Sequence, residues 1–389
     1  ARVGRGWAMS ASRQPALPPA LPDGLLLVVI AALLSVGLVA ISSASIEYAE
    51  WHYQNPWYHT QRHLVYVLLA VIAGVVVNRV PLSFWYRSGW VWLFLALFLL
   101  LVVLVPGVGR EVNGSQRWLP LGPLTLQPSE FAKLAVVVFL AGYLVRREEQ
   151  IRTRWSGFLK GMAVLAPVAV LLMAEPDFGA TVIILGTSFG MLFLGGARLL
   201  HLLALLLPAV AGLVYLVTSE PYRLQRLIAY TDPWADPYNS GFQLTQSLIA
   251  FGRGEWFGVG LGNSVQKLFY LPEAHTDFVF SIWAEETGFI GTLLVATLFT
   301  LLIGRILWVG RSAQVAGQLF GGYVCYGVAL VFSGQAFVNM GVSCGLLPTK
   351  GLTLPLVSYG GSSLIASCAM LALVLRIGQE TQQAQGGKR

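Results

Sequence analysis

The sequence has little charge and little cysteine. Only 11% of its 389 residues are Asp, Glu, Lys or Arg, whereas 56% are hydrophobic, and soluble domains carry about 25% charged residues. The mean hydropathy of +0.68 agrees with this composition. Three cysteines are too few for a disulfide framework. These shortages exclude an ordinary soluble enzyme and a disulfide-rich secreted scaffold. They predict one integral membrane domain.

The net charge of +7 is not gathered into a basic patch for nucleic acid. Most Lys and Arg residues stand at the ends of apolar runs, where they orient membrane spans. With the N-terminus placed inside, 16 of the 25 basic residues fall on the inner side and 14 of the 18 acidic residues fall outside. We therefore expect both termini in the cytoplasm. The acidic outer face indicates chemistry there, with an ordinary hydrated surface as the alternative.

Long apolar runs dominate the chain. Because about 20 apolar residues cross a bilayer as a helix, the sequence predicts an all-α integral membrane protein with about ten transmembrane helices. The predicted spans are 24–44, 62–80, 88–106, 128–146, 157–174, 177–196, 198–218, 277–308, 313–341 and 355–377. The eighth and ninth exceed the bilayer thickness, so we expect them to tilt, kink or project.

The spans divide the chain into a tail, a membrane domain and a second tail. We expect residues 1–23 to form a disordered cytoplasmic tail, 24–378 the membrane domain, and 379–389 a cytoplasmic C-terminal tail. Residues 219–276, between spans seven and eight, form the predicted large outer loop. Residues 344–363 are rich in Pro and Gly beside a span, and non-helical backbone at that depth must be buried or line a wet cavity.

Four charged residues fall inside predicted spans. Glu130 and Lys133 are three residues apart and share a helix face. They could line a functional interior or form an inert buried ion pair. Glu285 and Glu286 either face a polar interior or remain protonated or near the interface. A charge at mid-bilayer costs roughly 2.5–3.5 kcal/mol, so we expect the four residues to face one another or a wet internal cavity.

Asp277 stands where a polar loop meets the eighth span, in "LPEAHTDFVF" (271–280). One interpretation places Asp277 in the first turn of its helix, after Thr276 as the cap, where a negative charge complements the helix dipole. The other is a general base, because partial burial raises the pKa of a carboxylate toward the operating pH. His275 would pair with Asp277, bind a ligand or lie at the interface.

Two outer stretches carry weaker signals. "GRGEWFGVGLGNS" (252–264) is dense in glycine, so its backbone N–H groups could cradle a phosphate, with a flexible re-entrant loop as the alternative. "YRLQRLIAYTDPWADPY" (222–238) mixes aromatic residues with Arg223 and Arg226. It predicts an amphipathic helix on the outer interface, where arginine suits an anionic lipid headgroup or ordinary phospholipid.

Four longer stretches resemble the SEDS family of membrane glycosyltransferases, the shape, elongation, division and sporulation proteins. They are "LPEAHTDFVFSIWAEETGFIG" (271–291), "GLLPTKGLTLPLVSYGGSS" (345–363), "QPSEFAKL" (127–134) and "DPYNSGFQLTQSLIAFGRG" (236–254). The resemblance covers nearly all ten spans, and "PTKGLTLPLVSYGGSS" is closer to the division branch than to the elongation branch. Some division members carry a basic residue where this chain has Thr125, so no role of that side chain is carried over.

The resemblance implies a peptidoglycan glycosyltransferase that polymerises lipid II, an undecaprenyl-pyrophosphate-linked disaccharide pentapeptide. It implies work at the outer face of the bacterial cytoplasmic membrane, at the division septum. The implied partners are a class B penicillin-binding protein transpeptidase of the FtsI type and the division proteins FtsQ, FtsL and FtsB. The family's acidic residue matches Asp277 and its intramembrane ion pair matches Glu130 and Lys133.

The implied chemistry needs one base. The donor carries an α-linked pyrophosphate and the glycan product is β-1,4-linked, so a single inverting displacement requires a base for the acceptor's 4-hydroxyl proton. We assign this role to Asp277. The candidate substrate-binding residues are Lys350, Arg223, Arg253, His275 and Ser358. No cofactor or metal ligand is assigned; a divalent cation, Mg²⁺ or Mn²⁺, is an alternative way to offset the pyrophosphate charge.

Two other function classes remain open at this point. A lipid II flippase would use the buried charges as a passage for the headgroup, and would depend more on Glu130 and Lys133 than on Asp277. A scaffold that only activates the transpeptidase would tolerate substitutions in any cavity and would fail when its surface is changed. A polymerase should depend most on Asp277.

Overall fold

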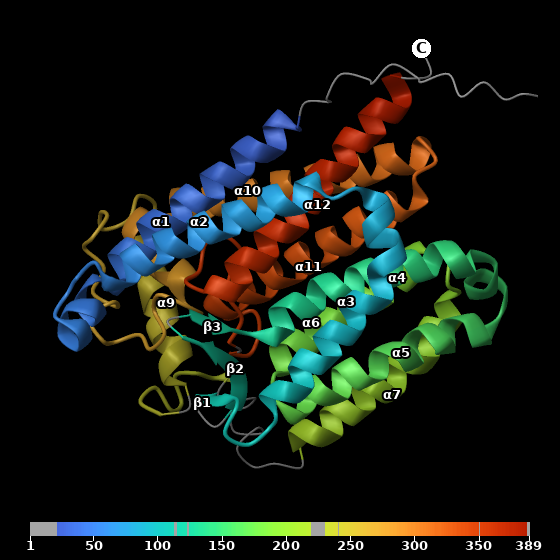
Figure 1. Cartoon of the computed structure of the whole chain (residues 1–389). Helices are drawn as coiled ribbons and strands as arrows, with labels where there is room; N and C mark the ends of the chain where they lie inside the picture. The colour runs from blue at the N-terminus through green and yellow to red at the C-terminus, as the bar shows by residue number, and fades with distance from the viewer. Residues whose placement is uncertain are drawn as a thin grey trace, which may run out of the picture.

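The computed structural model describes residues 22–112, 115–122, 124–218, 230–239, 241–349 and 351–386, and this part of the chain is mostly helical (Figure 1). The helices are α1 (Gly24–Tyr53), α2 (Tyr58–Arg79), α3 (Leu82–Val103), α4 (Pro128–Thr153), α5 (Trp155–Ala174), α6 (Phe178–Leu194), α7 (Leu199–Thr218), α9 (Phe242–Gly254), α10 (Val279–Val315), α11 (Leu319–Ser343) and α12 (Gly361–Gly386). The strands are β1 (Arg110–Val112), β2 (Ser115–Leu121) and β3 (Leu124–Leu126).

Every predicted span contains one of these helices, which confirms the membrane-helical fold class. In the described part of the chain, 8 helices are long and apolar enough to cross a membrane. Helix α6 is apolar but has 17 residues, and α7 covers the span predicted at 198–218. The exact number of spans stays a prediction.

The ends of the first and last spans differ from those predicted. Helix α1 continues past residue 44 to Tyr53 and ends at Gln54, which has a left-handed backbone (φ 53°); Pro56 follows. Helix α12 starts at Gly361 and runs to Gly386, so it includes most of the predicted tail 379–389. Hydropathy marks only the stretch that lies in hydrocarbon, whereas α12 continues beyond it and contacts Gln318 through the Thr381 hydroxyl at 2.9 Å.

Helices α4, α11 and α12 form the centre of the bundle. Most residues of α4 and α12 are buried inside the protein, whereas α2, α3 and α5 bury only one narrow face. The run from Val136 to Leu144 in α4 is almost continuously apolar and buried, as expected for a helix surrounded by others. The charges of α4 are therefore surrounded by protein.

Helix α10 is bent, as its length predicted. Gly288 has φ 68° and ψ −162°, a backbone that side chains with a Cβ avoid. The carbonyls of Glu285 and Glu286 accept bonds from the N–H groups of Val259 and Gly260 at 2.9 and 3.1 Å. The loop after α9 thus satisfies the backbone groups that the bend releases.

A small antiparallel sheet departs from the predicted all-helical character. Its strand order is β1-β2-β3, and it lies between α3 and α4 in the sequence. Ser362 joins it to the start of α12: its hydroxyl accepts from the backbone N–H of Gln127 (2.9 Å) and donates to the carbonyl of Thr125 (3.1 Å). The alternation of apolar and polar residues in so short a segment is too weak a signal to distinguish strands from a polar loop.

The beginning of α1 and the end of α12 lie at the same end of the bundle, whereas the sheet and α9 lie at the opposite end (Figure 1). Asp23, which caps α1, pairs with Arg305 of α10 at 2.7 Å. Glu380 of α12 accepts from the backbone N–H of Leu82 at 3.1 Å. Because the sheet, α9 and the turn before α10 share one end, the outer segments singled out in the sequence meet there.

Candidate functional site

Asp277 lies in the turn before α10. The cap residue of that helix is Phe278, and its first turn holds no acidic residue, so the interpretation that placed Asp277 in the first turn after Thr276 as cap is wrong. The Asn339 amide on α11 donates to the backbone oxygens of Asp277 (2.8 Å) and Leu352 (2.6 Å). One buried amide therefore fixes the Asp277 turn against the segment that begins at Gly351.

The Asp277 carboxylate is half-buried and makes no hydrogen bond or ion pair with any described residue. A methyl group on Gly351 would stand 2.8 Å from its Oδ2, so this backbone closes over the carboxylate. Burial, with a smaller effect from Glu273, raises the pKa of Asp277 from 3.8 to about 7, while Arg117 opposes the rise. A carboxylate with a pKa raised to about 7 and no partner among the described residues is suited to accept a proton.

His275 packs among aromatic rings and does not pair with Asp277 in the described contacts. Its ring centroid is 4.7 Å from that of His59, 5.3 Å from Tyr48 and 5.7 Å from Tyr359. Its backbone oxygen accepts from the Tyr359 N–H at 3.1 Å. Burial lowers the pKa of His275 to about 4, so the ring is neutral at neutral pH. This packing ties the Asp277 turn to α1, α2 and the start of α12.

The other predicted substrate-binding residues are placed differently. Ser358 is buried, and its hydroxyl accepts from the Leu354 N–H at 2.9 Å, so it shapes the turn in the last outer motif. Lys350 and Arg223 lie outside the described residues, as does most of the amphipathic helix predicted at 222–238. Arg253 lies on α9, where it pairs with a buried glutamate.

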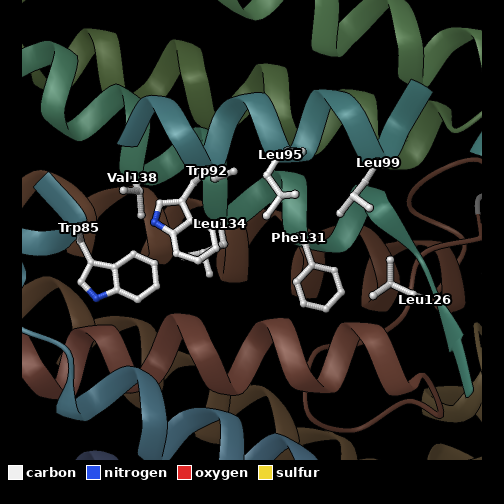
Figure 2. A pocket seen from close by; sticks show the side chains of 10 residues that line it. Trp85, Trp92, Leu95, Leu99, Leu126, Phe131, Leu134 and Val138 are labelled. Carbon is white, nitrogen blue, oxygen red and sulfur yellow. The ribbon is translucent and has the colours of Figure 1, made fainter. Parts of the chain in front are cut away.

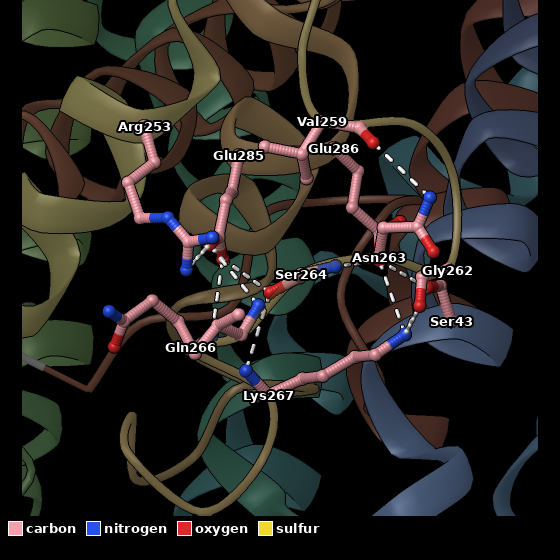
Figure 3. Close-up of polar contacts among 11 residues, drawn as sticks. Ser43, Arg253, Val259, Gly262, Asn263, Ser264, Gln266, Lys267, Glu285 and Glu286 are labelled. Carbon is pink, nitrogen blue, oxygen red and sulfur yellow. Dashed lines mark hydrogen bonds and ion pairs between the residues drawn. The ribbon is translucent and has the colours of Figure 1, made fainter.

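Glu285 and Glu286 are saturated with protein partners (Figure 3). Glu285 accepts from the N–H groups of Val265 and Gln266 (both 3.2 Å) and from the Ser264 hydroxyl, and it pairs with Arg253 at 3.1 Å. Arg253 is thus neutralised by a buried carboxylate. This partner disfavours the prediction that Arg253 binds the substrate.

Glu286 has its own set of partners in the same cluster. Its Oε1 is 3.4 Å from Nζ of Lys267 and 2.5 Å from the Ser43 hydroxyl of α1. Lys267 Nζ also donates to the Gly262 carbonyl at 2.6 Å. The acidic pair in α10 therefore joins α1, α9 and the glycine-rich loop into one unit.

The glycine-rich stretch 252–264 does not leave a phosphate cradle. It comprises the end of α9 and a loop whose N–H groups at Val259 and Gly260 bond the bent part of α10. The N–H of Ser264 donates to Glu286 at 3.4 Å. Because the protein's own oxygens take these donors, the stretch is a re-entrant loop that closes on α10.

Glu130 and Lys133 form the ion pair expected from their spacing. The Glu130 Oε2 and Lys133 Nζ atoms are 2.8 Å apart, and both side chains are almost fully buried. Neither atom has a hydrogen-bond partner elsewhere among the described residues. All four intramembrane charges are thus neutralised by pairing, and none depends on an open wet interior.

Two further charged groups, Arg117 and Asp177, were not singled out from the sequence, and Arg117 acts on Asp277. Arg117 of β2 contributes the positive charge that opposes the raised pKa of Asp277. Asp177 caps α6 through the N–H of Ala180 (3.2 Å) and accepts from the Ser129 hydroxyl at 3.0 Å. Both belong to short polar segments between spans, where only tertiary contacts reveal which charge faces the site.

An apolar cavity of about 140 Å³ lies between α3 and α4 (Figure 2). Its walls are exclusively hydrophobic side chains: Trp85, Trp92, Leu95, Ala96, Leu99, Leu126, Phe131, Leu134, Ala135 and Val138. Phe131 and Leu134 of its wall are next to Glu130 and Lys133 in α4. The cavity is suited to a hydrocarbon and not to a sugar or phosphate.

The described residues assemble no metal centre, because no group of three or more His, Cys, Asp or Glu side chains is placed to hold an ion. The divalent cation that could offset the pyrophosphate charge stays a prediction.

Comparison with known proteins gives one consistent family. A family model described as "Cell cycle protein" (FtsW, RodA and SpoVE) matches residues 24–383. The chain is 55% identical over 349 residues to a protein of Hahella chejuensis, covering 90% of this chain and 88% of that one. It is 53% identical over 357 residues to a protein of Pseudomonas fluorescens, covering 92% and 88%. Both are named "Probable peptidoglycan glycosyltransferase FtsW".

Solved structures agree with the sequence comparison. The chain superposes with a TM-score of 0.76 and 33% identity on a chain from "Structural coordination of polymerization and crosslinking by a peptidoglycan synthase complex", covering 93% of this chain and 99% of that one. It superposes on the rod shape determining protein RodA of Thermus thermophilus with a TM-score of 0.69 and 31% identity, covering 92% and 97%. Fold and sequence therefore lead to the same family.

Proposed function

The chain belongs to the FtsW, RodA and SpoVE family of cell cycle proteins, and we propose from this membership and from the isolated Asp277 carboxylate how it acts. It is a peptidoglycan glycosyltransferase of the cell-division branch, embedded in the membrane by apolar helices. Its substrate is lipid II, which it polymerises into β-1,4-linked glycan strands. The observation that carries the catalytic assignment is a half-buried acid that has no partner among the described residues and lies beside the closing segment at Gly351.

Asp277 acts as the general base of one inverting displacement. The acceptor sugar's 4-hydroxyl gives its proton to the carboxylate while its oxygen bonds the anomeric carbon of the donor. The anomeric carbon–oxygen bond breaks on the opposite face, and the lipid pyrophosphate leaves with the electron pair. Because burial raises the pKa of Asp277 to about 7, the carboxylate is basic enough to assist and is still largely ionised at slightly alkaline pH.

The remaining features support binding of a lipid-linked donor. Asn339 holds the backbone of the Asp277 turn and of Leu352, so the base is carried by a rigid scaffold. The apolar cavity between α3 and α4 offers a hydrocarbon-lined surface in the same molecule. Lys350 and Ser358 of the last outer motif, Arg223 of the outer loop and His275 remain proposed contacts to the substrate headgroup.

Asp277→Asn tests the assignment. The purified protein, reconstituted with its transpeptidase partner and with crosslinking blocked, is given labelled lipid II, and glycan strands are measured on gels. Loss of a general base typically lowers the rate by about 10²–10⁴-fold. Glu273→Gln, which removes an exposed carboxylate of the same turn, is the matched control and should retain activity. Polymerisation at the wild-type rate by Asp277→Asn would exclude Asp277 as the base.

The same experiment separates polymerisation from transport. A flippase would lose lipid II translocation when the pair Glu130–Lys133 is removed and would tolerate Asp277→Asn. The Glu130 Oε2 and Lys133 Nζ atoms are 2.8 Å apart and the pair is almost fully buried, which favours a structural role. Translocation that survives in Lys133→Met while polymerisation fails in Asp277→Asn supports the enzyme.

We further propose the setting of the reaction. Both termini are cytoplasmic, residues 24–378 form the membrane domain, and Asp277 faces the outer leaflet at the division septum. The shared end of α1 and α12 (Figure 1) and the 16 of 25 basic residues assigned to the inner side support this orientation. The proposed partners are a class B penicillin-binding protein of the FtsI type and FtsQ, FtsL and FtsB. Reporter fusions at both termini and co-purification test these proposals.

A further inference from the structure

Arg117 carries a charge that no described carboxylate neutralises. Arg253, Lys267 and Lys133 each form an ion pair with a buried glutamate. Arg117 forms none within the described residues, although it is half-buried. A desolvated, unpaired guanidinium is costly unless an anion comes to it.

Neutral oxygens hold the Arg117 side chain in place. Its Nε donates to the carbonyl of Glu175 at 3.2 Å, and its Nη2 donates to the carbonyl of Pro176 at 2.5 Å and to the Ser115 hydroxyl at 3.1 Å. Its Nη1 has no hydrogen-bond partner in the described part of the chain. The guanidinium is therefore fixed in position while its charge and the donors of Nη1 stay available.

The position of Arg117 relates it to the proposed base. Its charge lowers the pKa of Asp277 against the effect of burial, so the two groups are within electrostatic range of each other. The contacts also connect: Gly179, just past the turn that anchors Arg117, packs on Leu352, and Leu352 shares the Asn339 amide with Asp277.

Glu175, whose backbone carbonyl anchors Arg117, does not compete for its charge. Glu175 is fully buried, and neither of its carboxylate oxygens has a hydrogen-bond partner among the described residues. Burial, with a contribution from Asp177, raises the pKa of Glu175 to about 8. At neutral pH this group is therefore mostly protonated and leaves the guanidinium charge unmatched.

We infer that Arg117 binds the diphosphate of the lipid-linked donor and places the anomeric carbon against Asp277. The inference rests on the proposed function, because it assigns the leaving group of that reaction. The Nη1 amino group, which has no partner among the described residues, can donate to phosphate oxygens in a charge-assisted hydrogen bond. The positive charge stabilises the departing diphosphate more than the bound donor, because negative charge grows on the diphosphate as the bond breaks.

The test measures binding without polymerisation. Farnesyl diphosphate, farnesyl monophosphate and farnesol are titrated into the full-length protein in detergent by calorimetry, with inorganic pyrophosphate as a competitor. Arg117→Gln keeps a donor for the Glu175 carbonyl and removes the charge, whereas Arg117→Lys keeps the charge and removes the fork. Arg110→Ala, which removes an exposed arginine of the same sheet, is the matched control.

We expect the wild type and Arg110→Ala to bind the diphosphate at least about tenfold more tightly than farnesol. Arg117→Gln should lose this preference and bind farnesol unchanged, and Arg117→Lys should keep part of it. An unchanged preference in Arg117→Gln overturns the inference. So does a loss in Arg117→Lys as large as in Arg117→Gln, because the residue would then only shape the sheet. Competition by inorganic pyrophosphate as strong as by the lipid would assign the site to free pyrophosphate.

The outcome is independent of the catalytic assignment. Asp277→Asn should bind farnesyl diphosphate as the wild type does, because the base does not contact the leaving group. If Asp277→Asn still polymerises lipid II while Arg117→Gln loses diphosphate preference, the base is wrong and the anion site stands. If polymerisation needs Asp277 but diphosphate binding is unchanged in Arg117→Gln, the base assignment stands and the anion site is wrong.

Discussion

Asp277 and the pair Glu285–Glu286 lie on the same stretch of chain and differ in their partners. The pair in α10 is enclosed by two cations, two serine hydroxyls and loop N–H groups. Asp277, before the helix, has none of these among the described residues and only its backbone oxygen is held. A carboxylate that has every partner supplied by the protein stabilises the fold, and one left without a partner is available for chemistry.

The difference follows from where each acid lies relative to the bend in α10. Gly288 breaks the helix and lets the loop after α9 approach, which delivers Lys267 and the N–H groups of 264–266 to the two glutamates. The Asp277 turn faces Gly351. Because Gly351 has no side chain, it leaves room for the Asp277 carboxylate and supplies no side-chain donor to bind it. Substitutions at the two places should therefore have opposite consequences.

The largest stability effect is expected at Glu285. Glu285→Ala removes the partner of Arg253, which is 41% exposed, and strands the buried donors of Ser264 and Gln266, each of which costs about 1–3 kcal/mol when left unsatisfied. The thermal unfolding midpoint in detergent should fall markedly. Asp277→Ala, the same truncation in the turn before α10, should change it little. Equal losses in both variants would end the distinction between the two regions.

The next effect separates position from chemistry at Asp277. Gly351→Ala places a methyl 2.8 Å from Oδ2 of Asp277, too close for the carboxylate to keep its place. A displacement of about 1 Å lowers a rate by about 10²-fold, so polymerisation should drop by about that factor with little change in the unfolding midpoint. Gly304→Ala, in α10, adds a methyl that meets no described atom within 4 Å and should leave the rate unchanged.

A smaller effect is expected from pH. Because the pKa of Asp277 is raised to about 7, the ionised base is scarce below that pH and dominant above it. The rate constant kcat/KM for polymerisation should rise about tenfold per pH unit up to about 7 and then level. His275 does not add a step in this range, since its pKa is lowered to about 4. A profile that is flat from pH 5.5 to 8 would contradict the assignment of the base.

The sequence predicted the spans well because hydropathy reports burial in lipid directly, and each of the ten apolar runs contains a helix. It also paired Glu130 with Lys133, because their spacing on one helix is a local property. It did not pair Arg253 with Glu285, and it passed over Arg117. Both omissions concern contacts between segments far apart in the chain, and the composition of a loop does not specify which acid a cation meets.

The smallest predicted effect concerns stability at Asp277. The folded state raises the pKa of this group from 3.8 to about 7, so it binds the proton more tightly than the unfolded chain does. Stability contributed by the proton is present at low pH and is lost as pH rises through about 7. Asp277→Asn removes the cost of the buried charge, so its unfolding midpoint should equal or exceed that of the wild type at pH 8, with the difference vanishing near pH 4. A variant less stable than wild type at pH 8 would mean that the carboxylate has a stabilising partner, and would place Asp277 with Glu285 and Glu286.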